Sequence, residues 1–108
     1  MIVAFSSSSP IASVALFSES GELLADGERD ASMRASEACL AILQDLLKAT
    51  NRKLAETSLI VADLGPGSFT GVKVAVTLAK SLAFALSVQT AGATSFDLIS
   101  TDQTAVLP

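Results

Sequence analysis

DLGPGSFTG, residues 63–71, lies between an apolar run and a long run of helix-forming residues. Three glycines and a proline fall within the seven residues from Gly65 to Gly71. Glycine adopts backbone angles that other residues avoid, and proline fixes its own φ, so the stretch predicts a tight strand-to-helix connection. Ser68 or Thr70 is placed to cap the helix that follows. Main-chain N–H groups at a helix start also attract anions, so a phosphate site is the functional alternative.

The loop lacks the residues of two common phosphate-binding motifs. No Lys-Ser or Lys-Thr pair follows its last glycine, as a Walker A loop requires. The stretch is also not a Gly-x-Gly-x-x-Gly sequence that opens a first strand–helix unit. Most glycine-rich turns hold no ligand. We therefore interpret the loop mainly as a structural turn that positions the second helix.

Apolar patterns on both sides of the loop predict an α/β domain. Gly21 lies at the tip of an expected hairpin, and Asp30 or Ser32 is expected to cap the first helix. The expected strands cover residues 2–5, 13–17, 22–26, 59–63 and 89–93. The first expected helix ends near residues 49–51, and the second and third cover residues 70–87 and 95–100. The order β-β-β-α-β-α-β-α predicts a mixed sheet of about five strands with helices on its faces. It is the order of a single RNase H-like, or actin-like, lobe spanning residues 1–108. The opening hairpin argues against a Rossmann topology.

Composition excludes several classes of protein. The 108 residues are 50% hydrophobic and carry a formal net charge of −4, which disfavours a free-standing nucleic-acid binder. The chain has no His, so it has no imidazole metal site and no Ser–His or Cys–His nucleophile pair. Its one cysteine, Cys39, forms no internal disulfide and fits a reducing cytoplasm. No apolar run predicts a membrane span, and the N-terminus lacks the basic stretch of a signal peptide, so we expect a cytoplasmic protein.

The second helix is apolar almost all the way round, which is typical of a helix that is buried on most sides. Ala75, Ala79 and Ala83 recur every four residues and would let another backbone approach closely. We predict that this helix forms a partner interface beside the apolar face of the first helix; the alternative is a core helix within its own domain. The predicted interface residues are Leu40, Leu43, Leu47, Val72, Val76, Ala79, Lys80, Ala83 and Phe84.

Residues 65–86, GPGSFTGVKVAVTLAKSLAFAL, closely resemble the signature of the TsaB (YeaZ) family. Members usually show GPGSFTG, an apolar residue and Arg, then a helix containing A-K-x-L-A-F-A. MIVAFSSSSPIASVAL is similar to the family's opening strand pair, and TAGATSFDLIS resembles the segment after the second helix. The resemblance implies an actin-like, sugar-kinase-like ATPase superfold. It assigns the motif loop to Gly65, Pro66, Gly67, Ser68, Phe69, Thr70, Gly71 and Lys73.

The resemblance also implies a function. TsaB is regarded as a non-catalytic scaffold that pairs with TsaD and with itself through helices of its first lobe. TsaD puts the threonylcarbamoyl group on adenosine 37 of tRNA, and the ATPase TsaE joins the complex. We therefore expect no catalytic residues, a homodimer or a TsaD-like partner with a TsaE-like ATPase, and no direct contact with tRNA. The alternatives are a nucleotide-binding lobe with ATPase or kinase-like activity and, less favoured, a glycoprotease-like hydrolase.

The chain departs from the family pattern at several positions. Ser6 stands where the superfamily's first strand usually ends in the aspartate that helps hold metal and phosphate. Ala35 replaces the His before Ser36-Glu37, Lys73 replaces an Arg and so loses its bidentate fork, and Leu64 replaces an Arg. The family's second lobe would follow residue 108. We therefore expect no metal, no cofactor and weak or no ATP binding.

Overall fold

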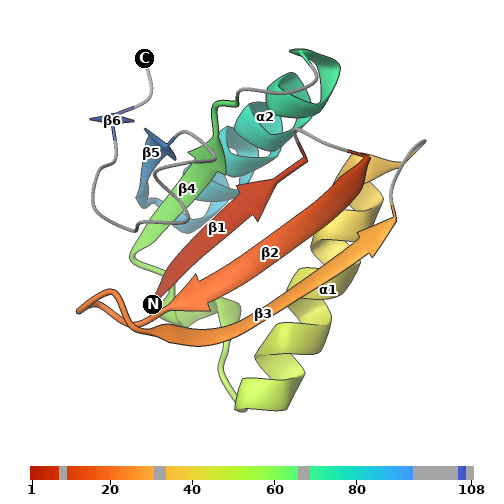
Figure 1. Ribbon diagram of the computed structural model, residues 1–108. Helices are drawn as coiled ribbons and strands as arrows, with labels where there is room; N and C mark the ends of the chain where they lie inside the picture. The colour runs from red at the N-terminus through yellow and green to blue at the C-terminus, as the bar shows by residue number, and fades with distance from the viewer. Residues whose placement is uncertain (8–9, 31–33, 66–68, 94–104, 107–108) are drawn as a thin grey trace.

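The computed structural model describes residues 1–7, 10–30, 34–65, 69–93 and 105–106. Figure 1 shows its elements in chain order. They are β1 (Ile2–Ser6), β2 (Ile11–Phe17), β3 (Leu23–Asp30), α1 (Ala35–Thr50), the short 3-10 helix η1 (Leu54–Glu56), β4 (Leu59–Asp63), α2 (Phe69–Leu86), β5 (Gln89–Ala93) and β6 (Ala105–Val106). The mixed α/β lobe predicted from the sequence is confirmed.

Within the described residues, the strands form one sheet in the order β3-β2-β1-β4-β5-β6. β1, β2 and β3 pair antiparallel, as the predicted meander requires, whereas β1, β4 and β5 pair parallel. Ile2 faces Leu59 and Phe5 faces Ala62 in the β1–β4 register. Parallel strands end at the same edge of a sheet, so the carboxyl ends of β1 and β4 bring Ser6 and Asp63 together.

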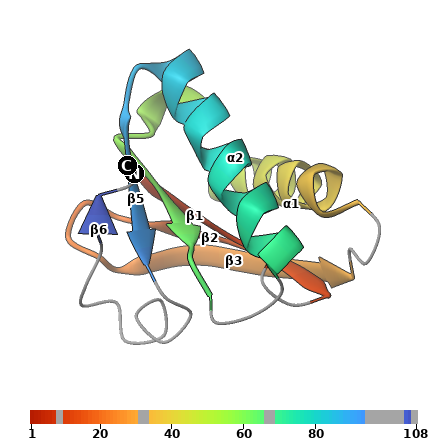
Figure 2. The same ribbon diagram turned by 90° about the horizontal axis from the view of Figure 1, so that it is seen from above.

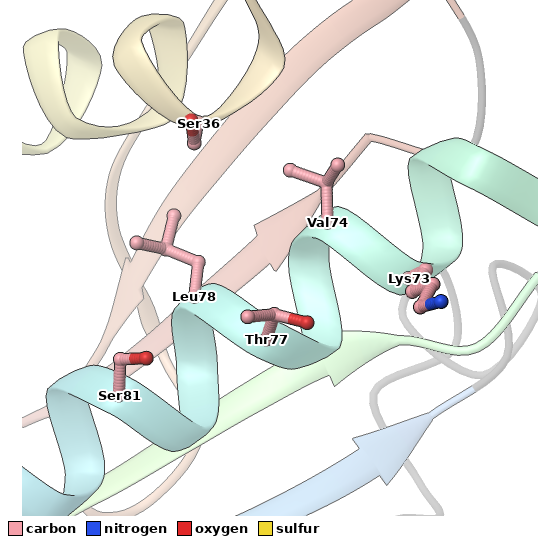
Figure 3. A pocket seen from close by; sticks show the side chains of 6 residues that line it. All are labelled: Ser36, Lys73, Val74, Thr77, Leu78 and Ser81. Carbon is pink, nitrogen blue, oxygen red and sulfur yellow. The ribbon is translucent and has the colours of Figure 1, made fainter.

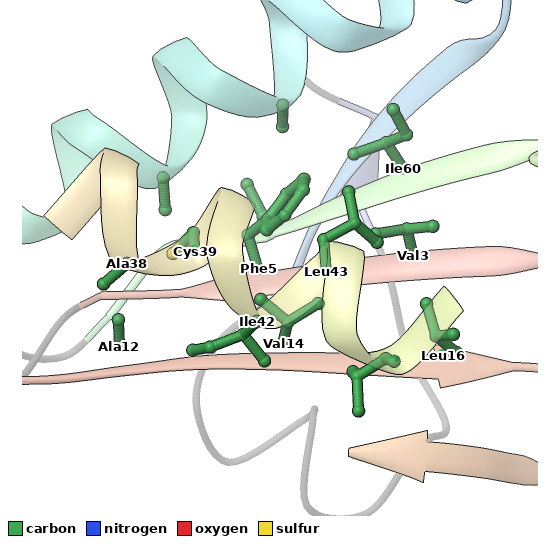
Figure 4. Packing of buried hydrophobic residues seen from close by; sticks show 14 of the residues in the cluster. Val3, Phe5, Ala12, Val14, Leu16, Ala38, Cys39, Ile42, Leu43 and Ile60 are labelled. Carbon is green, nitrogen blue, oxygen red and sulfur yellow. The ribbon is translucent and has the colours of Figure 1, made fainter. Parts of the chain in front are cut away.

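Both long helices cover the same face of the sheet (Figure 2). α1 packs over β2 and β3, and α2 packs over β4 and β5. Because side chains alternate along a strand, every second residue of β1 faces the helices. Val3 and Phe5 point into this helix-covered core, whereas Ala4 belongs to a smaller cluster with Val61 on the opposite face. Figure 4 shows Phe5 packed between the helices and the sheet, close to Leu43.

The start of α1 differs from the sequence-based expectation. β3 extends to Asp30, which pairs with Ile11 across the sheet, so Asp30 is a strand residue and does not cap the helix. α1 begins at Ala35, and its N-cap residue Arg34 makes no side-chain capping bond. β3 is the edge strand of the sheet, where charged residues are tolerated because one side faces solvent. The other expected cap, Ser32, and the expected helix over 95–100 lie outside the described residues.

The other boundaries that the structure describes lie within two residues of the expected ones. β4 and β5 have the predicted bounds, and α2 begins and ends one residue earlier than predicted. α1 ends at Thr50 because Asn51 adopts the left-handed conformation, with φ 54°. The main-chain N–H groups of Asn51 and Arg52 then donate to the last carbonyls of the helix, those of Lys48 and Leu47.

α2 is more apolar than α1. No helix in the part of the chain that the structure describes has the length and hydropathy needed to span a membrane.

Cys39 lies on the buried face of α1 with no exposed surface. Burial disfavours the thiolate and raises the pKa of the Cys39 thiol to about 11. A raised thiol pKa is the opposite of what a nucleophilic cysteine needs at neutral pH. The side chain therefore acts as a small apolar residue of the core.

We expect replacement of Phe5 by Ala to destabilise the domain by about 3–5 kcal/mol, because Phe5 has no exposed surface and its loss leaves a cavity. Phe84→Ala is a matched control, since the Phe84 side chain is 89% exposed; its effect should stay within about 0.5 kcal/mol. Urea denaturation followed by circular dichroism measures both changes. Equal losses from the two substitutions would contradict the packing described here.

We expect the buried thiol to make stability fall between pH 9 and pH 11. The unfolded thiol ionises near its ordinary pKa of 9, whereas the folded thiol keeps its proton up to about 11. Over this interval the folded state binds more protons than the unfolded state, so rising pH favours unfolding. Cys39→Ala should lose less stability than the wild type between pH 8 and pH 10.5 in urea titrations. Parallel losses in the two proteins would show that other groups cause the decline.

Candidate functional site

A buried carboxylate organises the edge of the sheet beside the glycine loop. Asp63, the last residue of β4, is only 1% exposed. Its Oδ2 accepts a hydrogen bond from Ser6 Oγ at 2.7 Å, and its Oδ1 accepts one from the main-chain N–H of Gly65 at 2.8 Å. An isolated carboxylate is costly to bury, and charge-assisted bonds of this kind offset that cost. Asp63 therefore joins the end of β1 to the first turn of the loop.

Further bonds fasten both ends of the loop. Ser7 Oγ donates to the main-chain oxygen of Gly71 at 2.6 Å, which connects the end of β1 to the first turn of α2. The N–H of Leu64 donates to the carbonyl of Ala93 at 2.7 Å. Gly65 has φ of 99°, a conformation that strongly favours glycine. The chain thus leaves β4 in a fixed direction as far as Gly65, and Ser7 holds the first turn of α2 beside the end of β1.

The structure gives only part of the predicted motif loop. Gly65 forms the turn as expected, whereas residues 66–68 lie outside the described residues. Phe69 and Thr70 form the first turn of α2. Ser6, which resemblance placed at a metal- and phosphate-holding position, donates instead to Asp63.

The role of Asp63 was not predicted. An available signal was its position: an acidic residue that directly ends the apolar run LIVA and precedes a glycine. Acidic side chains are almost never fully buried unless they are paired. The strand order alone does not show that Ser6 is the partner, because the two residues are 57 positions apart in the chain.

A groove of about 330 Å³ runs between α1 and α2. Figure 3 shows Val74 and Leu78 pointing from α2 toward α1, and Ser36 pointing back from α1. Lys73 lies at the outer side of α2, away from α1. The groove therefore has an apolar wall on α2 and hydroxyl or ammonium groups at its margins; its lining residues are Ser36, Lys73, Val74, Thr77, Leu78 and Ser81.

The predicted interface residues divide into two sets. Leu40 is 39% exposed, Phe84 is 89% exposed, and Lys80 is also exposed. The half-buried residues are Leu47, Val72 and Val76. All of these retain surface that a partner could contact, and their place in an interface stays a prediction.

The other three predicted interface residues lie in the core of this chain. Leu43, Ala79 and Ala83 are at most 4% exposed and belong to the helix-covered core. The four-residue alanine spacing does permit close approach, but α2 uses it to pack on its own sheet. Placing this alanine stripe at a partner interface was therefore wrong, because the sequence did not show which side of α2 faces the sheet.

Among the described residues, no group of three or more His, Cys, Asp or Glu side chains is arranged to hold a metal ion. Asp63 is the buried acid beside the loop, and each of its carboxylate oxygens accepts a hydrogen bond from the chain itself. This arrangement suits an anchor that holds the loop. The expectation of weak or no ATP binding remains a prediction.

Comparison with known proteins agrees with this geometry. A family model described as TsaD, tRNA N6-adenosine threonylcarbamoyltransferase, matches residues 29–103. The chain is 36% identical over 72 residues to the tRNA threonylcarbamoyladenosine biosynthesis protein TsaB of Bacillus subtilis. YeaZ from Pseudomonas aeruginosa superposes with a TM-score of 0.76 at 30% identity. A second structure, described as a protein with similarity to peptidase YEAZ from Pseudomonas aeruginosa, superposes with a TM-score of 0.77 at 30% identity.

These relatives are longer than this chain. The TsaB match covers 67% of the chain but 30% of the relative. The two structural matches cover 86% of the chain and 42% or 43% of the solved chains. The likeness therefore concerns the lobe that contains the glycine loop and the groove between α1 and α2.

We expect Asp63→Ala to destabilise the domain by about 2–4 kcal/mol, because it removes two charge-assisted hydrogen bonds and leaves the Gly65 N–H without that acceptor. Ser6→Ala is the graded control, since it removes one of the two bonds and should cost less. Chemical denaturation measures both effects, and amide hydrogen exchange of Gly65 reports on the loop itself. A faster Gly65 exchange is expected in Asp63→Ala alone; unchanged exchange would contradict the anchoring role.

Proposed function

Because the chain belongs to the TsaD family, among its TsaB and YeaZ relatives, we propose that it takes part in tRNA threonylcarbamoyladenosine biosynthesis as a non-catalytic partner protein. In this proposal α1 and α2 together form a docking face for a helix of another protein. The observation that carries the proposal is the groove between α1 and α2, together with Phe84, an almost fully exposed side chain on α2.

Phe84 supplies the apolar anchor of this face. It lies three residues after Ser81, which lines the groove, so the two side chains are neighbours on the helix surface. Leu40 follows Ser36 by four residues and so extends the α1 wall of the groove. Fully burying a side chain such as Phe contributes about 1.5–3 kcal/mol. An exposed aromatic beside an apolar groove is a feature of binding surfaces.

Three features support a non-catalytic role. The chain has no His, and its one thiol is buried with a pKa raised to about 11. The buried Asp63 already accepts hydrogen bonds at both carboxylate oxygens. These groups hold the lobe together, and none is presented as a base or nucleophile. The description of one structural relative mentions a peptidase, but we assign no peptidase residues in this chain.

A nucleotide-binding lobe is the second candidate, and one observation favours it. The glycine loop lies at the carboxyl ends of parallel strands, where ligands of α/β folds commonly bind. Calorimetry with Mg-ATP separates the two proposals. Tight binding that Asp63→Ala abolishes would replace the partner role by nucleotide binding.

We expect Phe84→Asp to abolish binding to a TsaD protein without unfolding the domain. The side chain is 89% exposed, so an aspartate there costs little stability but places a charge at the centre of the proposed contact. Leu23→Asp is the control, because Leu23 is 55% exposed on β3, away from the groove. Titration calorimetry against purified TsaD measures the loss, which should exceed tenfold in Kd for Phe84→Asp alone.

A second readout tests the role in cells. The threonylcarbamoyladenosine content of tRNA is measured by mass spectrometry in cells depleted of their own TsaB and supplied with this chain. The wild type and Leu23→Asp should restore the modification, and Phe84→Asp should not. Equal activity of the two aspartate variants would exclude the α2 face as the functional surface.

A further inference from the structure

Two donors from different parts of the chain converge on the Asp63 carboxylate. Ser6 Oγ, at the end of β1, donates to Oδ2 at 2.7 Å, and the main-chain N–H of Gly65 donates to Oδ1 at 2.8 Å. Ser6 is 57 positions away from Asp63 in the sequence, and Gly65 is two positions away. The carboxylate that receives both bonds is 1% exposed. A hydroxyl and a main-chain N–H therefore enclose one buried negative group.

These two donors are of the kinds with which proteins bind small anions. Main-chain N–H groups of glycine-rich turns and side-chain hydroxyls commonly hold phosphate groups. Gly65 has a φ of 99° and no side chain, so its N–H can come close to an anion. Because β1 and β4 pair parallel, both donors lie at the carboxyl edge of the sheet, where ligands of α/β folds commonly bind. The chain thus places its own anion where such an edge could hold an external one.

A simple local turn would explain only one of the two bonds. An aspartate or asparagine side chain in a turn often accepts a hydrogen bond from the N–H two residues later. Such a turn requires neither burial of the side chain nor a hydroxyl from a distant strand, and Asp63 has both. Burial of a carboxylate is costly, and charge-assisted bonds from two sides offset that cost. The surroundings of Asp63 are therefore those of an enclosed anion.

Neighbouring donors at this edge are also used within the chain. Ser7 Oγ donates to the carbonyl of Gly71 at 2.6 Å, and the Leu64 N–H donates to the carbonyl of Ala93 at 2.7 Å. These donors meet neutral main-chain oxygens, whereas those of Ser6 and Gly65 meet a carboxylate. Asp63 is thus the group that decides whether an external anion can reach this edge.

We propose that Asp63 is an internal anion that occupies the anion-binding donors at the end of β1 and the start of the loop, and so excludes phosphate from them. A second negative group beside Asp63 would be repelled by it and would find both donors already engaged. Removing the carboxylate uncovers a site for a small anion. Formate matches it in size, because Asp63→Ala removes one carboxylate group and formate is that group with a hydrogen. This property belongs to the sheet edge and holds whether or not α1 and α2 bind a partner.

Chemical rescue of Asp63→Ala by formate tests the proposal. Urea denaturation compares the variant in sodium formate with the variant in sodium chloride at equal ionic strength. At a formate concentration of ten times its Kd, the unfolding equilibrium constant of the variant should fall about elevenfold relative to chloride. The wild type should show no such difference, because its own carboxylate holds the donors. If the variant is unfolded in chloride, formate should restore its folded circular dichroism spectrum. An equal effect of formate on the two proteins, or no effect on the variant, would overturn the proposal.

Three controls separate an anion site from a cavity that any small molecule fills. Formamide has nearly the shape of formate without its charge and should not stabilise Asp63→Ala. Asp63→Asn keeps the position filled with a neutral side chain, so formate should have no effect on it. Adding Ser6→Ala to Asp63→Ala removes one donor and should weaken formate binding by about tenfold. Equal stabilisation by formate and formamide would overturn the proposal.

A measurement on the wild type tests the exclusion of phosphate directly. Inorganic phosphate should stabilise the wild type no more than sodium chloride does at equal ionic strength. Stabilisation of the wild type by phosphate that Asp63→Ala removes would overturn the proposal, because Asp63 would then assist anion binding. Neither outcome bears on binding to TsaD, so failure here leaves the proposed function standing, and loss of the proposed function leaves this test unchanged.

Discussion

The hydrogen bonds of Asp63 are the constraint on which the rest of the lobe depends. The carboxylate receives the Ser6 hydroxyl from β1 and the Gly65 N–H from the loop, and it does so with 1% of its surface exposed. These bonds fix the end of β1, the end of β4 and the direction in which the chain leaves the sheet. Beside them, Ser7 holds the first turn of α2 to the end of β1 through its bond to the carbonyl of Gly71.

The groove is a consequence of how the helices share one face of the sheet. The small side chains Ala75, Ala79 and Ala83 let α2 lie close to its strands, and the larger residues Val74 and Leu78 then point sideways toward α1. The surface left over on α2 is narrow and carries lysines and one phenylalanine. In the proposed function this face binds a helix of a partner, and burial of its apolar side chains supplies affinity.

Local sequence patterns predicted well where the strands and helices lie, but predicted poorly which other residues they contact. β4 and β5 were located at their observed bounds, because short apolar runs between turn residues depend little on distant contacts. One of the two capping residues expected for the first helix, Asp30, belongs to a strand, because its pairing with Ile11 extends β3 beyond its apolar part. Periodicity also showed that α2 is apolar on most sides, but it could not show which side meets the sheet, so Ala79 and Ala83 were placed at an interface instead of in the core.

The sequence by itself determined the order of strands and helices from β1 to β5, the family signature from Gly65 to Leu86, and the absence of any histidine chemistry. These depend on residue type, spacing and local turn geometry, all of which are read along the chain. Only the tertiary structure decided that Ser6 meets Asp63 and that Phe84 remains in solvent. Both depend on contacts between residues far apart in the sequence, such as the parallel pairing of β1 with β4, which no local pattern specifies.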